Sequence, residues 1–230
     1  MFRLENVAKH FKHRSREVIA LHPTSFEVGT GELLAIVGPS GSGKTTLLST
    51  LGGMLAPTGG TVWFEGRSLY AASPRERAEV RQHRIGFVFQ TFNLIPYLTA
   101  LENVEVPLML SGAAVSHQHD RAAALLDRVG LSDRLDHKPS ELSVGQQQRV
   151  ALARTLANDP AVILADEPTG NLDPATREAV LDFFGELCHE GRTVILVTHD
   201  PAAAARAHRT IKLANGGLES DLERSMQRVA

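Results

Sequence analysis

The segment from Gly38 to Thr46 constrains this chain more than any other part of its sequence. It reads Gly-Pro-Ser-Gly-Ser-Gly-Lys-Thr-Thr, which matches the pattern GxxxxGK[ST], and it follows the apolar run 33–37. Glycines let such a loop turn sharply with its backbone N–H groups directed inward, and the helix expected from Thr45 to Leu51 adds a positive dipole end. The sequence therefore predicts a buried strand, a phosphate-binding loop and a helix, in that order.

Two side chains of this loop have expected roles. Lys44 would bring positive charge to the outer phosphates, and the Thr45 hydroxyl would ligate the magnesium ion that accompanies nucleotides. A flexible glycine loop without a ligand is the alternative, and the order of strand, loop, lysine and helix argues against it. The predicted ligand is a magnesium nucleotide, contacted by Gly38, Pro39, Ser40, Gly41, Ser42, Gly43, Lys44, Thr45 and Thr46.

Two adjacent acids follow a second apolar run. Residues 162–165 are of the type found in buried parallel strands, and Asp166 and Glu167 come directly after them, before Pro168. Asp166 is expected to hold magnesium, whereas Glu167, pointing to the other face of the strand, is placed to accept a proton from an attacking water. A solvated Asp-Glu-Pro turn is the alternative, which the four preceding aliphatic residues disfavour.

Two further segments carry polar residues at the ends of predicted elements. Ser143 and Gln146 form a capping-box pattern before the helix-forming stretch 150–157, and a capped helix N-terminus is also an anion site. His199 ends the apolar run 194–198, where it would be able to donate to a γ-phosphate. A single histidine in such a place is more often structural, so both interpretations stay open on the residues alone.

Together these segments resemble the nucleotide-binding subunits of ABC transporters, over the chain from Leu4 to about Gly217. The resemblance implies ATP and Mg²⁺ as ligands, adds a glutamine loop at Gln90, and places Phe11 where the family stacks an aromatic ring on adenine. It implies Glu167, His199 and Lys44 as catalytic residues. It assigns the metal to Thr45, Gln90 and Asp166, and ATP binding across a dimer to Ser143, Gly145, Gln146 and Asp173 of the second copy.

The stretches 87–104 and 164–173 are similar to the lipoprotein-releasing and macrolide-efflux subgroup. That similarity implies an ATP-dependent homodimer, a membrane permease contacted through Gln90 to Tyr97, and a cytoplasmic position on the inner face of the membrane. A regulator without transport, as in control of cell-wall hydrolases during division, is the alternative. A soluble ATPase of this family acting on ribosomes or DNA would carry two cassettes or a long coiled-coil insertion, and this chain has neither.

One residue departs from the family pattern. The signature usually reads Leu-Ser-Gly-Gly-Gln, and this chain has Val144 at the first glycine. A backbone N–H at the first helical position still donates to a phosphate when a side chain is present. The β-branched side chain is expected to affect only how closely a second copy approaches.

The predicted fold class is α/β, with a P-loop NTPase core on a mostly parallel sheet, an antiparallel β-subdomain and a helical signature lobe. The chain is expected to be a single ATP-binding domain, residues 1–230, with a helical lobe at about 99–158 and a frayed tail at 218–230. Within the lobe, Ala122, Leu125, Leu126 and Val129 recur at helical spacing, and Gly130 is a predicted C-cap.

Composition excludes several classes of protein. The net charge is −2, which gives no overall field for binding nucleic acid, and the single cysteine, Cys188, permits no internal disulfide and is expected in the core. No apolar run is long enough to cross a membrane, and the first residues lack the pattern of a signal sequence. His117 and His119 are expected near a solvated turn and not in a metal site.

The segment after Gln90 is unusually apolar. It places Phe92, Leu94, Ile95, Pro96 and Tyr97 within six positions, and the proline argues against a continuous helix. Two interpretations are equally supported: a loop buried in its own core, or the lining of a groove for a cytoplasmic helix of a membrane subunit.

Overall fold

The computed structural model describes residues 1–13 and 16–223. Its larger sheet has six strands in the order β10-β9-β3-β8-β7-β6, which are Gly217–Glu223, Arg209–Ala214, Leu33–Val37, Thr193–Thr198, Val162–Asp166 and Ile85–Phe89. All neighbours pair in parallel except β10 and β9, which are antiparallel. The carboxyl ends of β3, β7 and β8 therefore lie at one edge of the sheet, and this edge positions the site.

The smaller sheet is antiparallel and has the order β2-β1-β4-β5, formed by Arg16–Val28, Phe2–His13, Gly59–Phe64 and Arg67–Ser68. The predicted antiparallel subdomain is therefore confirmed. Its first two strands are long, because β1 and β2 continue to pair through residues 9–13 and 16–19.

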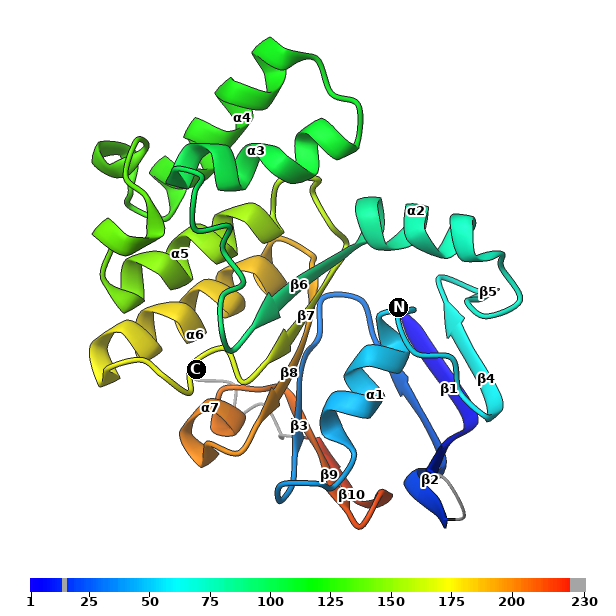
Figure 1. The fold of residues 1–230 in the computed structure, drawn as a ribbon. Coiled ribbons are helices and arrows are strands. Elements are labelled where there is room, and N and C mark those ends of the chain that lie inside the picture. Colours follow the sequence, from blue (N-terminus) through cyan, green and yellow to red (C-terminus); the bar gives the residue numbers. More distant parts are fainter. Residues whose placement is uncertain (14–15, 224–230) are drawn as a thin grey trace.

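Helices cover both faces of the large sheet (Figure 1). The helical lobe contains α3 (Ala100–Leu110), α4 (Val115–Arg128) and α5 (Val144–Thr155), with short 3₁₀ turns at Ser132–Arg134 and Pro139–Glu141. The remaining helices are α1 (Lys44–Leu51), α2 (Pro74–Arg84), α6 (Pro174–His189) and α7 (Pro201–Ala205). The predicted lobe and the predicted mostly parallel core are both present.

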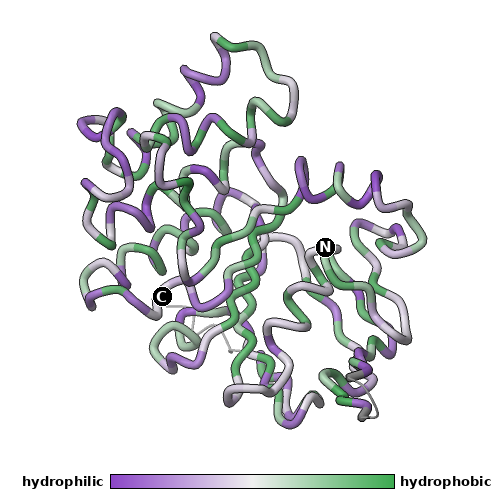
Figure 2. The backbone as a smooth tube through the Cα atoms, in the orientation of Figure 1, coloured by the Kyte–Doolittle hydropathy of each residue, from purple (hydrophilic) through white to green (hydrophobic). Residues whose placement is uncertain are grey.

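The large sheet is buried on both faces, as its continuous apolar strands require. Along β3, Leu33 and Ala35 belong to the core under the helical lobe, whereas Leu34 and Ile36 belong to the core shared with α1 and the small sheet. Figure 2 shows these central strands as the most hydrophobic part of the chain. Cys188 is buried in the first of these cores, as expected, and burial raises the pKa of its thiol to about 11.

Gly130 ends α4 as predicted. Its φ is +70°, its N–H donates to the carbonyl of Asp127 at 2.8 Å, and the N–H of Leu131 donates to the carbonyl of Leu126 at 2.8 Å. These two bonds form a Schellman motif, whose left-handed position favours glycine.

Two expectations outside the site were wrong. Residues 218–223 are not a frayed tail, because they form β10 against β9 and are held by the bidentate pair of Arg209 with Asp221; the rest of the predicted tail lies outside the described residues. His117 and His119 lie within α4 and not in a turn, and His119 pairs with Glu105 at 3.4 Å. In the part of the chain that the structure describes, no helix combines the length and apolar character needed to cross a bilayer.

Candidate nucleotide site

The loop between β3 and α1 follows the path expected of a phosphate loop. Gly43 stands directly before α1 with a φ of +97°. A Cβ atom at Gly43 would lie 2.4 Å from the carbonyl oxygen of Ala20, and one at Gly38 would lie 2.2 Å from that of Leu213. Both positions exclude a side chain, because the loop packs tightly between β2 and β9.

Lys44 is held inside this loop. Its ammonium group donates to the carbonyl oxygens of Gly38 at 2.8 Å and Pro39 at 3.0 Å, and the residue is only 9% exposed. Ser42 is buried beneath the loop, and its hydroxyl has no hydrogen-bond partner among the described residues. A buried ammonium group with only two neutral partners keeps a donor free for an anion, which suits a phosphate.

Oxygen ligands of the type that Mg²⁺ prefers meet next to the loop. The Thr45 hydroxyl lies 3.4 Å from Oδ1 of Asp166, the last residue of β7. Burial, with a smaller contribution from neighbouring Glu167, raises the pKa of Asp166, while Thr45 and Lys44 act in the opposite direction. Mg²⁺ bound with a nucleotide would stabilise the charged carboxylate, so the residues present fit this metal.

Glu167 and His199 form a pair at the ends of β7 and β8. Oε1 of Glu167 lies 2.9 Å from Nδ1 of His199, and the backbone N–H of Glu167 donates to the carbonyl of Val197 at 2.9 Å. Glu167 has a φ of +48°, so the chain turns at this residue and directs the carboxylate toward the histidine. The Glu167 side chain is 17% exposed and that of His199 72%, so the pair points into an open cleft.

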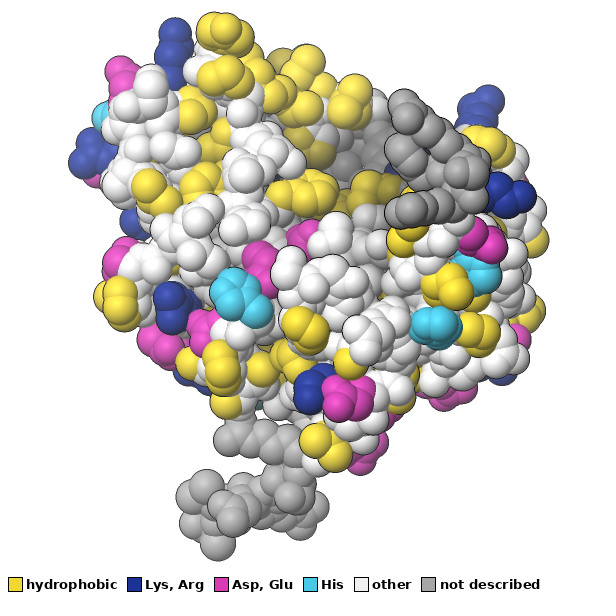
Figure 3. All heavy atoms as spheres, turned by 60° about the horizontal axis from the view of Figure 1, so that its bottom comes forward, with side chains coloured by type: hydrophobic (Ala, Val, Ile, Leu, Met, Phe, Trp, Pro, Cys, Tyr) yellow, Lys and Arg dark blue, Asp and Glu magenta, His cyan; other side chains and the backbone are white. Residues whose placement is uncertain are grey.

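This cleft has a volume of about 690 Å³ and contains most of the residues predicted from the sequence. Its lining includes Ser40, Gly41, Gly43, Lys44, Thr45, Thr46, Gln90, Asp166, Glu167 and His199. Gly38, Pro39 and Ser42 are not among its lining residues: the first two accept from Lys44 through their carbonyls, and Ser42 is buried. Figure 3 turns this end of the molecule toward the viewer; its centre is mostly white, with histidine and acidic side chains around it.

Phe11 also lies outside the cleft lining. It is 41% exposed on β1, pairs across the sheet with Val18, and has the ammonium group of Lys9 5.2 Å from its ring centroid. Val18, Ile19 and Ala20 of β2 form the cleft wall nearest to it, and the sequence analysis did not identify them. Val18 and Ile19 are adjacent β-branched residues that are both exposed on an edge strand, and this exposure would have indicated a site. It follows only from the register of β2, which the sequence does not show.

The residues assigned to a second copy lie apart from this cleft. Ser143 caps α5 in the predicted capping box, accepting from the N–H of Gln146 at 3.3 Å while its own N–H donates to Oε1 of Gln146 at 2.8 Å. Asp173 caps α6 by accepting from the N–H and hydroxyl of Thr176, and these hydrogen bonds lower the pKa of Asp173. Within one copy, the caps of α5 and α6 are exposed and do not face the copy's own phosphate loop.

Gly145 of α5 lies close against Thr176 of α6. A Cβ atom at Gly145 would lie 2.9 Å from Cγ2 of Thr176, whose hydroxyl is already bonded to Asp173. Val144, by contrast, is the first residue of α5 and is 49% exposed. The second glycine of the signature is therefore required for packing within one copy, and the first position has room for the valine.

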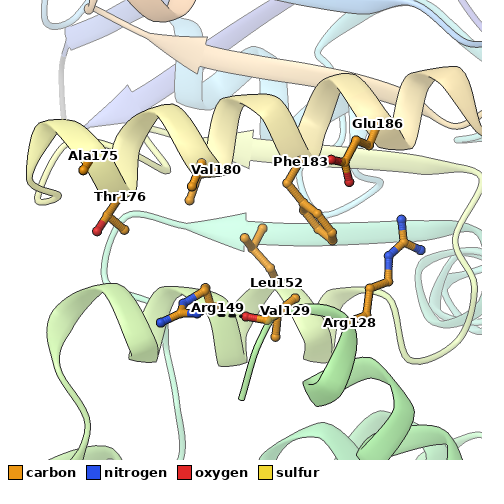
Figure 4. Close-up of a pocket in the computed structure, with 10 residues that line it drawn as sticks. Arg128, Val129, Arg149, Leu152, Ala175, Thr176, Val180, Phe183 and Glu186 are labelled. Carbon is orange, nitrogen blue, oxygen red and sulfur yellow. Dashed lines mark hydrogen bonds between the residues drawn. The ribbon is translucent and has the colours of Figure 1, made fainter. Parts of the chain in front are cut away.

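A second cavity, of about 470 Å³, lies between α5 and α6 beyond this contact (Figure 4). Leu152, Val180 and Phe183 point into it, and Arg149 donates to the carbonyl of Val129 at 3.0 Å at its floor. Arg128 stacks on Phe183 with its Cζ atom 5.2 Å from the ring centroid. None of the predicted site residues lines this cavity.

Gln90 lines the cleft and begins a loop that several hydrogen bonds from other segments hold. Its carbonyl accepts from Nδ2 of Asn171 at 3.5 Å, and its side-chain amide lies close to Gly170. Phe92 and Asn93 have φ values of 57° and 50°, which are uncommon for residues with a side chain. The guanidinium group of Arg154 donates to the carbonyls of both residues at 2.6 Å and so holds them in this conformation.

Asn103 fixes the second half of the same loop. The residue is fully buried, accepts from the N–H of Ile95 at 2.8 Å, and donates to the carbonyls of Ile95, Leu98 and Thr99. Neither Asn103 nor Arg154 was predicted from the sequence. Each is a polar residue among the apolar positions of a predicted helix. A buried polar side chain normally has a hydrogen-bond partner, so both residues could have been singled out on that ground.

The sequence left two interpretations of the apolar segment 92–97, a buried loop or an exposed contact surface. The first half of the segment fits the former and the second half fits the latter. Phe92 is buried in the core under the helical lobe, and Leu94 packs against that core. Ile95 is 39% exposed and Tyr97 is 83% exposed, so this second half faces outward. The loop is therefore anchored by its first residues and presents its last ones.

Comparison with known proteins agrees with this geometry. Residues 21–170 match the family model described as "ABC transporter". The chain is 47% identical over 224 residues to a macrolide export ATP-binding/permease protein MacB of Syntrophobacter fumaroxidans, covering 96% of this chain but 31% of that protein. It is 50% identical over 203 residues to an uncharacterised ABC transporter ATP-binding protein of Thermotoga maritima, covering 88% of this chain and 87% of that one.

A solved structure supports the same assignment. The dimeric ATP-binding cassette MJ0796, in a post-hydrolysis state bound to ADP and Pi, superposes with a TM-score of 0.91 at 41% identity. The match covers 98% of this chain and all of that one. The chain therefore belongs to the ABC transporter family, as one of its ATP-hydrolysing ATP-binding cassettes.

Proposed function

We propose that this cassette closes as a homodimer on ATP and powers a membrane complex that exports or extracts lipids, lipoproteins or amphipathic compounds. The observation that carries the proposal is the cleft that brings Lys44, Asp166, Glu167 and His199 together. The similarity to MacB, a named macrolide export protein of which this chain spans about a third, supports export as the task.

Each cleft residue has a proposed role. Glu167 accepts a proton from the attacking water, and His199, held by Glu167 at 2.9 Å, donates to the γ-phosphate. Lys44 and the N–H groups of the phosphate loop stabilise charge on the transferred phosphoryl group. Thr45 and Asp166, with Gln90 at the cleft wall, would hold Mg²⁺, which would neutralise phosphate charge.

The second half of each site comes from the other copy. Ser143, Gly145 and Gln146 lie at the start of α5, where helix amides and the dipole favour an anion, and Asp173 lies at the neighbouring cap of α6. A two-fold dimer brings these groups against the phosphate loop of the partner, so ATP joins the two copies and hydrolysis releases them. The dimer reported for MJ0796 supports this arrangement.

Val144→Gly tests the signature position. We expect this substitution to lower the ATP concentration needed for half-maximal dimerisation by about two- to fivefold, because the half-exposed valine stands on the surface that meets ATP and the partner. Glycine near the helix start costs at most about 1 kcal/mol of stability. Size-exclusion chromatography over an ATP series measures the effect, and unchanged or weaker dimerisation would show that the site is adapted to valine.

The proposed permease contact is a groove beside the glutamine loop. It has a volume of about 670 Å³ and lies between α2, β6 and the helical lobe; its lining includes Phe87, Phe89, Asn93, Val106 and Pro107. Arg154, which fixes the loop after Gln90, also lines the groove. A cytoplasmic helix seated here would therefore touch the same loop that senses the nucleotide, which supports coupling through Gln90 to Tyr97 and a peripheral position on the inner face of the membrane.

Tyr97→Glu and Leu94→Glu separate docking from folding. Tyr97 is 83% exposed, so its replacement should leave the melting temperature and basal ATPase rate unchanged while reducing co-purification with the membrane partner by about tenfold or more. Leu94 packs on the core, so its replacement should lower the melting temperature by roughly 4–8 °C, from a loss of about 2 kcal/mol.

Leu222→Glu is the matched control for Tyr97→Glu, because Leu222 is 65% exposed on β10, away from the groove. It should change none of the three measurements. Co-purification at the wild-type level with Tyr97→Glu would remove this residue from the proposed permease contact.

A further inference from the structure

Three large apolar side chains are exposed together where α3 meets α4. Met109 is 60% exposed, Leu110 75% and Val115 79%, and we refer to these three residues as the apolar tip. In Figure 1 this connection lies at the end of the molecule opposite the loop that precedes α1. The tip is therefore far from the phosphate loop, and neither of the two cores includes it.

A positively charged pocket lies directly beside the apolar tip. Its volume is about 580 Å³, and its lining includes Ser111 and Ala113 of the α3–α4 connection together with His117, Arg121, Arg128 and Arg192. We refer to these last four residues and the space between them as the arginine pocket. Asp159 also lines this pocket, and a phosphate-bearing ligand is the natural partner for a pocket lined by three arginines.

The charges in the arginine pocket do not cancel. Arg192 pairs with Asp159 and Glu190, and Arg128 pairs with the same Glu190. Arg121 has one hydrogen bond in the described structure, from Nη2 to the carbonyl of Leu156 at 3.3 Å, and no acidic partner among the described residues. Three guanidinium groups thus share two carboxylates, which leaves a local positive charge although the chain carries −2 overall.

The tip and the pocket continue the surface of the proposed permease groove. Leu110 lines that groove, and Asn158 lines both the groove and the arginine pocket. Nδ2 of Asn158 donates to the carbonyls of Gln82 and Pro107 at 3.0 and 3.1 Å, and so ties α2 to α3 between the two cavities. The groove, the apolar tip and the arginine pocket therefore share one face of the molecule. When the groove lies against a membrane protein, the tip and the pocket face the bilayer.

We propose that this surface binds an anionic phospholipid membrane directly. The apolar tip enters the headgroup region, and the arginine pocket, in which Arg121 has no acidic partner among the described residues, takes a lipid phosphate. Apolar side chains beside basic ones are the combination that holds proteins on anionic membrane surfaces. The inference rests on the proposed function only for the orientation of this face, because binding to lipid requires no permease.

The test uses the purified chain and vesicles of phosphatidylcholine with or without phosphatidylglycerol. We expect co-sedimentation only with the phosphatidylglycerol vesicles, weakened by salt. Arg121→Gln should weaken it about fivefold, the loss expected for one basic residue near an anionic surface. The double substitution of Met109 and Val115 by serine should weaken it about tenfold or more.

Matched controls separate this surface from the rest of the molecule. Arg67→Gln removes an exposed arginine from β5, and Leu222→Ser removes an exposed leucine from β10; both should bind vesicles as the wild type does. Melting temperature and basal ATPase rate should stay unchanged in every variant, which confirms folding. Failure of vesicle binding with intact ATPase and permease capture would overturn this inference while leaving the proposed function in place.

The remaining outcomes also decide the question. Equal binding to both kinds of vesicle, or wild-type binding by the tip and Arg121 variants, would refute the proposal. A third result would also refute it: the wild-type chain binds inorganic phosphate in calorimetry, Arg121→Gln abolishes that binding, and the wild-type chain does not bind vesicles. The pocket would then hold a free anion. Loss of permease capture with intact vesicle binding in the tip variant would assign the tip to a protein partner.

Discussion

Glu167→Gln should lower ATP turnover by about 10²-fold or more while leaving ATP binding intact. Glutamine keeps the shape of the side chain and is able to hydrogen-bond Nδ1 of His199, which lies 2.9 Å from Oε1 in the wild type. It has no carboxylate to accept a proton from water. ATP should therefore still join the two copies, and the dimer should persist on size-exclusion chromatography when the wild-type dimer has already separated.

The chain offers a closely matched control for this substitution. Glu105 also pairs with a histidine, His119, at 3.4 Å, and its side chain is 20% exposed, against 17% for Glu167. Glu105→Gln removes the same kind of carboxylate from the helical lobe and should leave turnover unchanged. Wild-type turnover from Glu167→Gln would remove Glu167 from the role of base, and loss of ATP binding would show that the substitution had disturbed the cleft.

The sequence predicted the elements of this site because each one is a local pattern. A glycine loop between an apolar strand and a helix, and acids after an apolar run, specify both the strand and its C-terminal edge. The parallel pairing of β3, β7 and β8 then brings Lys44, Glu167 and His199 to one cleft. That step also needs the strand order, in which β8 lies between β3 and β7.

What the sequence did not predict depends on contacts between distant segments. The positive φ of Glu167 is stabilised by a hydrogen bond to Val197 in the next strand, and the bent loop after Gln90 by Arg154, more than sixty positions away. The strand β10 was missed because its sequence is polar, and it is stabilised by pairing with β9. Local propensity carries no information about such partners.

Lys44→Ala should act on binding itself, in contrast to Glu167→Gln. The Lys44 ammonium group lies inside the phosphate loop on the carbonyls of Gly38 and Pro39, and the proposed function assigns it to the outer phosphates. Hydrogen bonds to a charged group contribute about 1.5–3 kcal/mol, so ATP affinity should fall roughly ten- to hundredfold. Titration calorimetry measures that loss, and no ATP-dependent dimer should form at ATP concentrations that dimerise the wild type.

The same substitution should make Mg²⁺ binding more sensitive to acid. Burial raises the pKa of Asp166, and the charge of Lys44 acts against that rise, so alanine at 44 should raise the pKa further. Because the metal needs the charged carboxylate, Mg²⁺-dependent nucleotide binding should be lost at a higher pH in the variant as pH falls. Lys212→Ala removes a half-exposed lysine of β9 that pairs with Glu219. It should change neither the ATP affinity nor the pH at which Mg²⁺-dependent nucleotide binding is lost. A stable ATP-dependent dimer from Lys44→Ala would contradict the phosphate contact, since the charge that holds the nucleotide would then have to come from elsewhere.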